Sequence, residues 1–221
     1  TAATLNLAKA AAKAGVKRFV FLSSIAVNGS HTSGRKPFAA DDTPAPQTVY
    51  GQSKLEAELA LKGVQRDAPG LAIEIIRCPA VIGRKAPGNL ALLDRLARRH
   101  VPLPFASIQN RRAFLAVDDL ADFIHARLEA DAGGFNTFLL AAQDCISTPD
   151  FIRAIAKARQ TNALLFRFPA SLLRRLLEAA NMRDKADALT RNLEIDISPA
   201  LATGWRPKLT IEAAIEKACA S

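Results

Sequence analysis

The sequence predicts an α/β fold built around a parallel sheet. Short apolar runs typical of buried strands alternate along the chain with longer stretches that have helical spacing. Hydrophobic residues make up 49% of the 221 residues and charged residues 23%, which supports a sizeable buried core. No apolar run approaches the roughly 20 residues of a membrane span, so we expect no membrane insertion.

The first part of the chain alternates helix, strand, loop and helix. Residues 2–14 have a helical pattern that ends at Gly15, and RFVFLSS (18–24) is typical of a buried strand. Residues 28–48 are rich in Gly, Pro, Asp, Ser and Thr and predict a long loop, which in a compact protein is usually functional. A helix is predicted over 49–66. The buried face of the first helix is expected to hold Leu5, Leu7, Ala8 and Ala11.

The remainder of the chain continues the alternation. Residues 79–88 form a loop rich in Pro and Gly, and the helix at 147–158 opens with a capping pattern. Strands are predicted at 71–78, 111–116, 135–141 and 163–168. Helices are predicted at 89–99, 118–129 and 147–158, and over most of the chain after 168.

The chain carries a formal net charge of +9, from 30 Lys and Arg against 21 Asp and Glu. A basic surface without a partner, an anionic small molecule and a nucleic acid would each account for this charge. The basic residues are scattered, and no Lys/Arg run has aromatic residues between its members. We therefore do not expect a nucleic-acid partner.

Cysteine usage points to a reducing compartment. Cys78, Cys145 and Cys219 are odd in number and widely spaced, so they suggest neither a disulfide framework nor a metal site. The first fifteen residues lack the basic start and the apolar segment of a signal peptide. A cytoplasmic protein is expected.

Tyr50, the only tyrosine, stands four residues before Lys54 at the start of the helix predicted over 49–66. This spacing places both side chains on one face of the helix. An ammonium within about 4–6 Å stabilises a phenolate and can turn tyrosine into an acid–base group near neutral pH. A solvated Tyr–Lys pair on a surface helix is the alternative. Ser24 ends the first predicted strand, where α/β proteins present side chains to ligands.

This Ser, Tyr and Lys arrangement resembles that of the short-chain dehydrogenase/reductase superfamily. The likeness extends over nearly the whole chain and is greatest to its extended branch, the NAD-dependent nucleotide-sugar epimerases and dehydratases, including UDP-glucose 4-epimerase-like enzymes. It rests on six motifs in the family's order: AGVKRFVFLSSIAVNG, YGQSK, IRCPAVIG, GNLALLDRL, NRRAFLAVDDLADFI and TGWRPKLTIEAAI.

The resemblance implies roles for individual residues. Ser24 would bond the C4 oxygen of the sugar, Tyr50 would be the acid–base group, and Lys54 would hold the nicotinamide ribose. Ser23 would also contact the cofactor. The substrate contacts implied are Asn89 and Arg112 toward the diphosphate or sugar and Phe105 toward the uracil. Asn89 also suits a helix N-cap, Arg112 a solvated strand end and Phe105 an ordinary core position. His31, His100 and His125 carry no pattern and are expected to be structural.

Two positions depart from the family's pattern. Asn28 stands where many relatives have Tyr, and the sequence alone offers no physical account of it. Ala80 stands where several epimerases have a substrate-binding Asn, so the sugar cannot be assigned from the motif.

The family's dinucleotide fingerprint, G-x-x-G-x-x-G after a first strand, is missing. The resemblance implies the C-terminal part of a Rossmann-type parallel sheet and a smaller, mostly helical substrate lobe, with roughly 100 residues of the N-terminal βαβ half absent. Residues 1–83 and 109–141 would then belong to the partial dinucleotide-binding domain, and residues 84–108 and 142–221 to the nucleotide-sugar domain. We expect such a fragment to be inactive by itself.

The function implied is an NAD-dependent enzyme, with NADP possible, that acts on a UDP-sugar. UDP-glucose or UDP-N-acetylglucosamine 4-epimerase in surface-polysaccharide biosynthesis is the first hypothesis. One-way reduction of a UDP-4-keto-6-deoxy sugar is the second, and a non-catalytic dinucleotide-binding sensor or scaffold is the third. The family resemblance also implies a homodimer built on helices 2–14 and 49–66.

Overall fold

In the computed structural model, residues 1–84, 101–131 and 133–220 are described. The predicted helix at 89–99 lies outside these ranges. The elements of the first half are α1 (Ala2–Lys13), β1 (Arg18–Ser24), the short 3-10 helix η1 (Ile25–Val27), α2 (Val49–Asp67), β2 (Ala72–Cys78) and β3 (Ala80–Ile82). Those of the second half are β4 (Phe114–Ala116), α4 (Val117–Glu129), β5 (Phe135–Leu139), α5 (Thr148–Ala158), α6 (Ala170–Ala179), α7 (Arg183–Thr190), α8 (Ser198–Leu201) and α9 (Ile211–Cys219).

The sheet confirms the α/β prediction. Among the described residues, β1, β2 and β5 form a parallel sheet in the order β1-β2-β5, and β3 pairs in parallel with β4. In register, Ser24 at the end of β1 stands beside Cys78 at the end of β2. Every residue of the central strand β2 is buried, as expected of a parallel strand covered on both faces.

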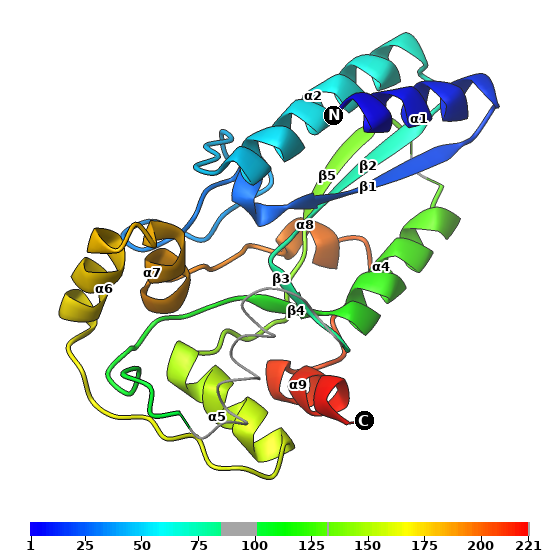
Figure 1. The fold of residues 1–221 in the computed structure, drawn as a ribbon. Coiled ribbons are helices and arrows are strands. Elements are labelled where there is room, and N and C mark those ends of the chain that lie inside the picture. The colour runs from blue at the N-terminus through cyan, green and yellow to red at the C-terminus, as the bar shows by residue number, and fades with distance from the viewer. Residues whose placement is uncertain (85–100, 132, 221) are drawn as a thin grey trace.

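Helices cover both faces of this sheet (Figure 1). On one face, Ala8 of α1 and Leu61 and Val64 of α2 pack against Ile73 and Ile75 of β2. On the other face, an aromatic cluster joins α4, β5 and the segment after α8. In this cluster the Phe123 ring meets Phe138 and Trp205 edge to face, each at a centroid distance of 5.3 Å.

A second group of helices lies beyond β3 and β4 (Figure 1). α5 and α9 pack together, with Phe151, Ile155 and Ile215 buried against Ile82 and Ala116 of the two short strands. α6 and α7 lie further from the sheet, at the end of the molecule toward which the loop 28–48 extends. No helix in the described ranges is long and apolar enough to cross a membrane.

Three predictions about elements are wrong. Residues 163–168 do not form a strand, since Leu165 makes only an isolated bridge to Leu103. The reason is that Leu103 is flanked by Pro102 and Pro104, which have no N–H to continue a ladder. Conversely, the predicted loop 79–88 contains β3, whose three apolar residues are too few to show a period.

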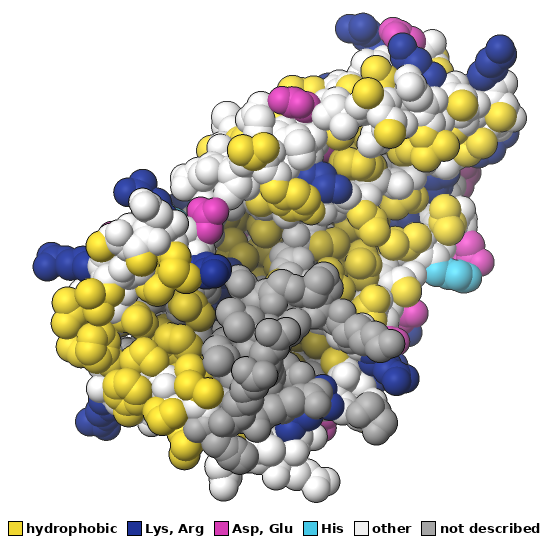
Figure 2. Space-filling model, in the orientation of Figure 1, with side chains coloured by type: hydrophobic (Ala, Val, Ile, Leu, Met, Phe, Trp, Pro, Cys, Tyr) yellow, Lys and Arg dark blue, Asp and Glu magenta, His cyan; other side chains and the backbone are white. Residues whose placement is uncertain are grey.

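The third error concerns α1. Leu7 was expected on the buried face of this helix, but 63% of it is exposed, whereas Ala8 is fully buried. The helix therefore turns one apolar residue away from its own sheet. Lys and Arg side chains are spread over the visible surface rather than gathered into one patch (Figure 2), as the sequence predicted.

Candidate active site

A cavity of about 300 Å³ lies at the carboxyl ends of β1 and β2. In open α/β sheets this end of the strands is where ligands bind. Its walls come from segments far apart in the sequence: the end of β1 and η1, the residues before α2, the link between β2 and β3, and α7. The lining residues are Ser24, Ile25, Ala26, Gly29, Ser30, Gln47, Thr48, Pro79, Ala80, Arg112, Asp184, Asp187, Ala188 and Leu193.

Ser24 lines this cavity, as its position at a strand end predicted. It is also the N-cap of η1, because its Oγ accepts a hydrogen bond of 3.2 Å from the backbone N–H of Ala26. A hydroxyl that accepts in this way still has its own hydrogen to donate. The cap therefore fixes the side chain and leaves a donor for a ligand oxygen.

Tyr50 and Lys54 lie on the first two turns of α2. Thr48 caps the helix by accepting a hydrogen bond of 3.0 Å from the N–H of Gly51, and Thr48 itself lines the cavity. Lys54 Nζ donates to the carbonyl of Leu22 at 2.9 Å and lies 5.7 Å from the centroid of the Tyr50 ring. The ammonium is thus held between β1 and the tyrosine, and Tyr50 itself is 56% exposed.

Gly51 explains how this helix approaches β1 so closely. A Cβ at this position would lie 2.6 Å from the carbonyl oxygen of Ala26 and 3.1 Å from Cβ of Pro46. Only glycine therefore allows the first turn of α2 to rest on η1, directly after Ser24. The sequence carried a signal for this contact, because glycine in a helix costs roughly 1 kcal/mol relative to alanine and needs a reason.

Arg112 faces the cavity from the other side. Its backbone is held on both edges, by bridges to Ile146 and Leu193, which fixes where the side chain begins. Burial lowers the pKa of its guanidinium to about 10, and the charge of Asp187 offsets this only in part. Within the described ranges the guanidinium donates one hydrogen bond, a long one of 3.4 Å to the carbonyl of Arg191. A desolvated cation with weak partners beside a cavity suits an anionic ligand.

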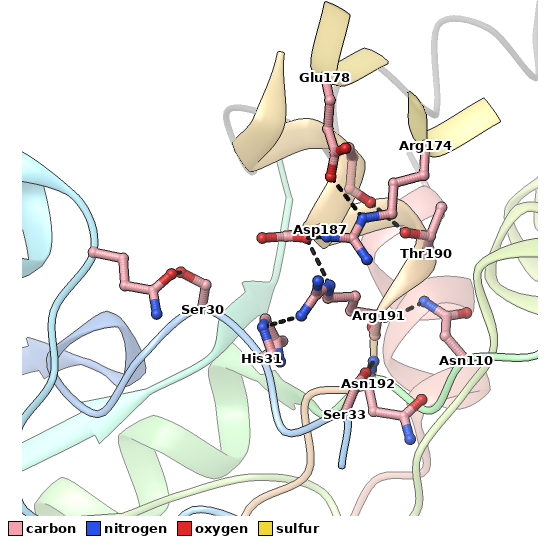
Figure 3. Close-up of polar contacts among 12 residues, drawn as sticks. Ser30, His31, Ser33, Asn110, Arg174, Glu178, Asp187, Thr190, Arg191 and Asn192 are labelled. Atoms are coloured by element: carbon pink, nitrogen blue, oxygen red, sulfur yellow. Dashed lines mark hydrogen bonds and ion pairs between the residues drawn. The ribbon is translucent and has the colours of Figure 1, made fainter. Parts of the chain in front are cut away.

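A row of charged side chains extends from the loop 28–48 to α6 and α7 (Figure 3). Arg191 contacts Nε2 of His31 on one side, and its Nε lies 2.9 Å from Asp187 Oδ1 on the other. Arg174 continues the row, 3.6 Å from Asp187 and 2.8 Å from Glu178. Burial, and then the charge of Arg191, lowers the pKa of His31 below its ordinary value.

The sequence did not predict this row. His31 was expected to be structural, in the absence of any pattern, and it does join a loop to α7. Asp184 and Asp187 line the cavity, although nothing in the sequence singled them out. They become neighbours of Arg112 only through the tertiary fold.

The other predicted site residues lie elsewhere. Phe105 is 8% exposed and packs in a core cluster with Leu103, Ile152 and Leu173, the alternative that the sequence left open. Ser23 is buried and donates its hydroxyl to Glu58, so its side chain is turned away from the cavity. Asn89 lies outside the described residues. Ala80, where several epimerases have Asn, does line the cavity but offers no hydrogen bond from its side chain.

Comparisons with known proteins agree with the fold and with the family resemblance. A UDP-glucose 4-epimerase of Vibrio cholerae is 36% identical over 214 residues, which are 96% of this chain and 65% of the relative. A dTDP-4-dehydro-6-deoxyglucose reductase of Escherichia coli is 23% identical over 92% of this chain and 60% of its own. The solved UDP-glucuronic acid 4-epimerase of Bacillus cereus, in complex with NAD, superimposes with a TM-score of 0.75 at 19% identity.

That structural match covers 98% of this chain and 64% of the solved one, so the chain spans somewhat under two thirds of the length of these relatives. The sequence model of the NAD dependent epimerase/dehydratase family matches residues 1–141, which carry Ser24, Tyr50, Lys54 and Arg112. The chain belongs to the NAD dependent epimerase/dehydratase family.

Proposed function

We propose that this chain forms the catalytic and substrate-binding part of a nucleotide-sugar 4-epimerase that acts on UDP-glucose or UDP-N-acetylglucosamine in surface-polysaccharide biosynthesis. The observation that carries the proposal is that Ser24 and Arg112 line one cavity, while Thr48 of that cavity caps the helix bearing Tyr50 and Lys54. A hydroxyl donor and a cation suited to an anion thus share one cavity, and the acid–base pair lies on the first two turns of the helix that begins at its wall. The V. cholerae relative, named a UDP-glucose 4-epimerase, supports the same reaction.

Each residue has a role that its geometry permits. Tyr50 takes the proton from the sugar's 4-hydroxyl and later returns it, because its exposed ring stands at the cavity end of α2. Ser24 donates its free hydrogen to the same sugar oxygen. Arg112 binds the diphosphate, for which a planar guanidinium is suited.

The residues around Lys54 fit the nicotinamide end of NAD. The Lys54 ammonium already donates to the Leu22 carbonyl and has hydrogens left to donate to ribose hydroxyls. When bound, the cofactor would accept hydride from C4 and return it to the opposite face. NADP is the alternative cofactor.

One-way reduction of a UDP-4-keto-6-deoxy sugar is the second candidate. It uses the same Ser24, Tyr50 and Lys54, and the E. coli relative is named a dTDP-4-dehydro-6-deoxyglucose reductase. Ala80 favours neither reaction, because a methyl group cannot distinguish the two sugars by hydrogen bonding. A non-catalytic sensor remains the third, but it would have no use for an acid–base tyrosine.

The experiment that separates these functions follows the sugar and the cofactor together. The full-length protein is incubated with UDP-glucose or UDP-N-acetylglucosamine, and the anomeric proton signals are followed by NMR. An epimerase converts each sugar to its C4 epimer without net change in NADH absorbance. A reductase consumes NAD(P)H with a 4-keto sugar, and a sensor changes neither signal.

We further propose a homodimer in the cytoplasm. α1 and α2 pack side by side, and both leave leucines on the surface: Leu7 is 63% exposed and Leu59 is 60% exposed. Ala57 and Leu61 of α2 are instead buried toward the sheet, so the helix has a second apolar side that its own core does not cover. Apolar side chains reach the surface along these helices in Figure 2.

A further inference from the structure

A buried ionic cluster lies directly beneath the proposed catalytic residues. Arg77 of β2 and Glu58 of α2, each 5% exposed, form two parallel hydrogen bonds of 2.6 and 3.1 Å. Ser23 of β1 donates to the same carboxylate. Arg77 also donates to Asn28 Oδ1 at 3.0 Å, and Asn28 donates to the carbonyl of Ala39 at 2.9 Å. We call Ser23, Asn28, Glu58 and Arg77 the α2 anchor.

Every member of the α2 anchor adjoins a residue of the candidate site. Glu58 lies one turn after Lys54 and two turns after Tyr50, so the three share one face of α2. Ser23 precedes Ser24 in β1, and Arg77 precedes Cys78, which stands beside Ser24 in the sheet. Asn28 is the C-cap of η1, the helix that Ser24 begins.

The contact between Arg77 and Glu58 depends on direction, whereas the surrounding apolar contacts do not. Leu61 and Val64 hold α2 against the sheet but would tolerate a small rotation of the helix about its axis. A planar guanidinium that binds a carboxylate through two hydrogen bonds tolerates such a rotation poorly. Such a rotation would move Tyr50 and Lys54 relative to Ser24.

Stability alone does not account for the pair. Replacing a buried ion pair by apolar residues of similar volume is often neutral or stabilising, because burial removes both charges from water. We propose that Glu58 and Arg77 are positioning residues that set the rotation of α2 and thereby place Tyr50 and Lys54 beside Ser24. This inference rests on the function proposed above, and it gives Asn28, which departs from the family's pattern, a physical role as an acceptor for Arg77.

The same strand supplies a matched control. Glu74 of β2 is fully buried and is bonded by Arg18 and Arg127, with Arg127 donating at 2.7 and 2.9 Å. Glu74 lies three positions before Arg77 and stands beside Val20 rather than the end of β1. Glu74→Gln therefore weakens a buried carboxylate–arginine contact of the same kind away from the site.

The first measurement needs no turnover. Tyr50 is the only tyrosine of these 221 residues, so in full-length protein grown with 3-fluorotyrosine the ¹⁹F resonance that Tyr50→Phe removes reports on the candidate site. We expect Glu58→Gln to shift or broaden this resonance and Glu74→Gln to leave it unchanged. An unchanged resonance in folded Glu58→Gln protein overturns the inference, whatever reaction the enzyme catalyses.

The second measurement uses the full-length enzyme. We expect Glu58→Gln to lower kcat about tenfold or more with KM changed less than about threefold, whereas Glu74→Gln lowers stability with kcat nearly unchanged. The double variant Glu58→Gln/Arg77→Met removes both charges and should regain thermal stability but not kcat. Recovery of kcat together with stability would contradict positioning. Absence of 4-epimerase or reductase turnover in the wild type would refute the proposed function, while the ¹⁹F result still decides the role of the anchor.

Discussion

At the scale of single residues, Arg112 is the clearest candidate for recognising the substrate's charge. Burial lowers its pKa to about 10, yet the group stays charged at neutral pH and faces the cavity. The negative charge of a bound diphosphate would offset the free-energy cost of removing this cation from water. We expect Arg112→Met in the full-length enzyme to raise KM for a UDP-sugar about 10- to 100-fold with a smaller effect on kcat.

Steady-state kinetics at neutral pH test this prediction, and Arg112→Lys is the matched control. Lysine keeps the charge but cannot form two parallel hydrogen bonds, so its KM should lie between those of wild type and Arg112→Met. Equal KM values in all three proteins would remove Arg112 from the binding site.

Residues that form a local pattern were predictable from the sequence, and residues that meet through the fold were not. The spacing of Tyr50 and Lys54 on one helix predicted that their side chains would be neighbours, and they are. Ser24 could be predicted as a site residue from the position of the strand end alone. Glu58 and Arg77, by contrast, are 19 positions apart on different elements, and their contact becomes visible only when α2 lies across β2. Asp187, which lines the cavity, could not be predicted for the same reason.

At the scale of elements, the approach of α2 to η1 depends on Gly51. Alanine is the better helix former by roughly 1 kcal/mol, but its Cβ would collide with the Ala26 carbonyl. We expect Gly51→Ala to lower the free energy of unfolding by about 1–3 kcal/mol, because the overlap forces a backbone shift. Urea unfolding followed by circular dichroism measures this change.

Gly63, on the same helix, is the control for that experiment. A Cβ added there meets nothing within 4 Å, so Gly63→Ala should raise stability by up to roughly 1 kcal/mol. If both substitutions stabilised the protein equally, the close contact between α2 and η1 would not exist in solution.

The loop 28–48 should dock on α7 in a pH-dependent manner. The pKa of His31 is lowered by burial and by Arg191, with Asp187 opposing and Arg174 adding to the effect. The unfolded chain therefore binds more protons than the folded one just below pH 6.5, so stability rises with pH through that window and is fully present above it.

His31→Gln tests this dependence, because glutamine can still accept a hydrogen bond from Arg191 but does not titrate. Urea midpoints measured between pH 5 and 7.5 should depend less on pH in this variant than in wild type. The same pH slope in both proteins would show that other groups cause it.

Elements with a clear hydrophobic pattern of their own were predicted well. Elements that depend on pairing with another segment of the chain were not. The helix predicted over 49–66 is α2, and the strand predicted over 18–24 is β1. The run 163–168 looks like a strand by itself, but the prolines beside Leu103 limit it to one bridge. The strand β3 exists because β4 lies beside it.

At the scale of the whole molecule, the exposed leucines of α1 and α2 are the basis for the proposed dimer. We expect the full-length protein to be a dimer at micromolar concentration and Leu59→Glu to dissociate it, because a buried unpaired carboxylate opposes association. Light scattering coupled to size exclusion gives the masses. Leu128→Glu, at a leucine of α4 that is 57% exposed, is the control and should leave the dimer intact. A wild-type monomer would rule the dimer out.

The central claim is that Tyr50, held by Lys54 and facing the space beside Ser24 and Arg112, carries the proton in the reaction at C4. Its most direct test is Tyr50→Phe in the full-length enzyme, which keeps the ring and removes only the reacting oxygen. We predict that turnover of the UDP-sugar, followed by NMR, falls by roughly two orders of magnitude or more while binding of the UDP-sugar, measured by calorimetry, is nearly unchanged. Turnover equal to that of wild type would contradict the account.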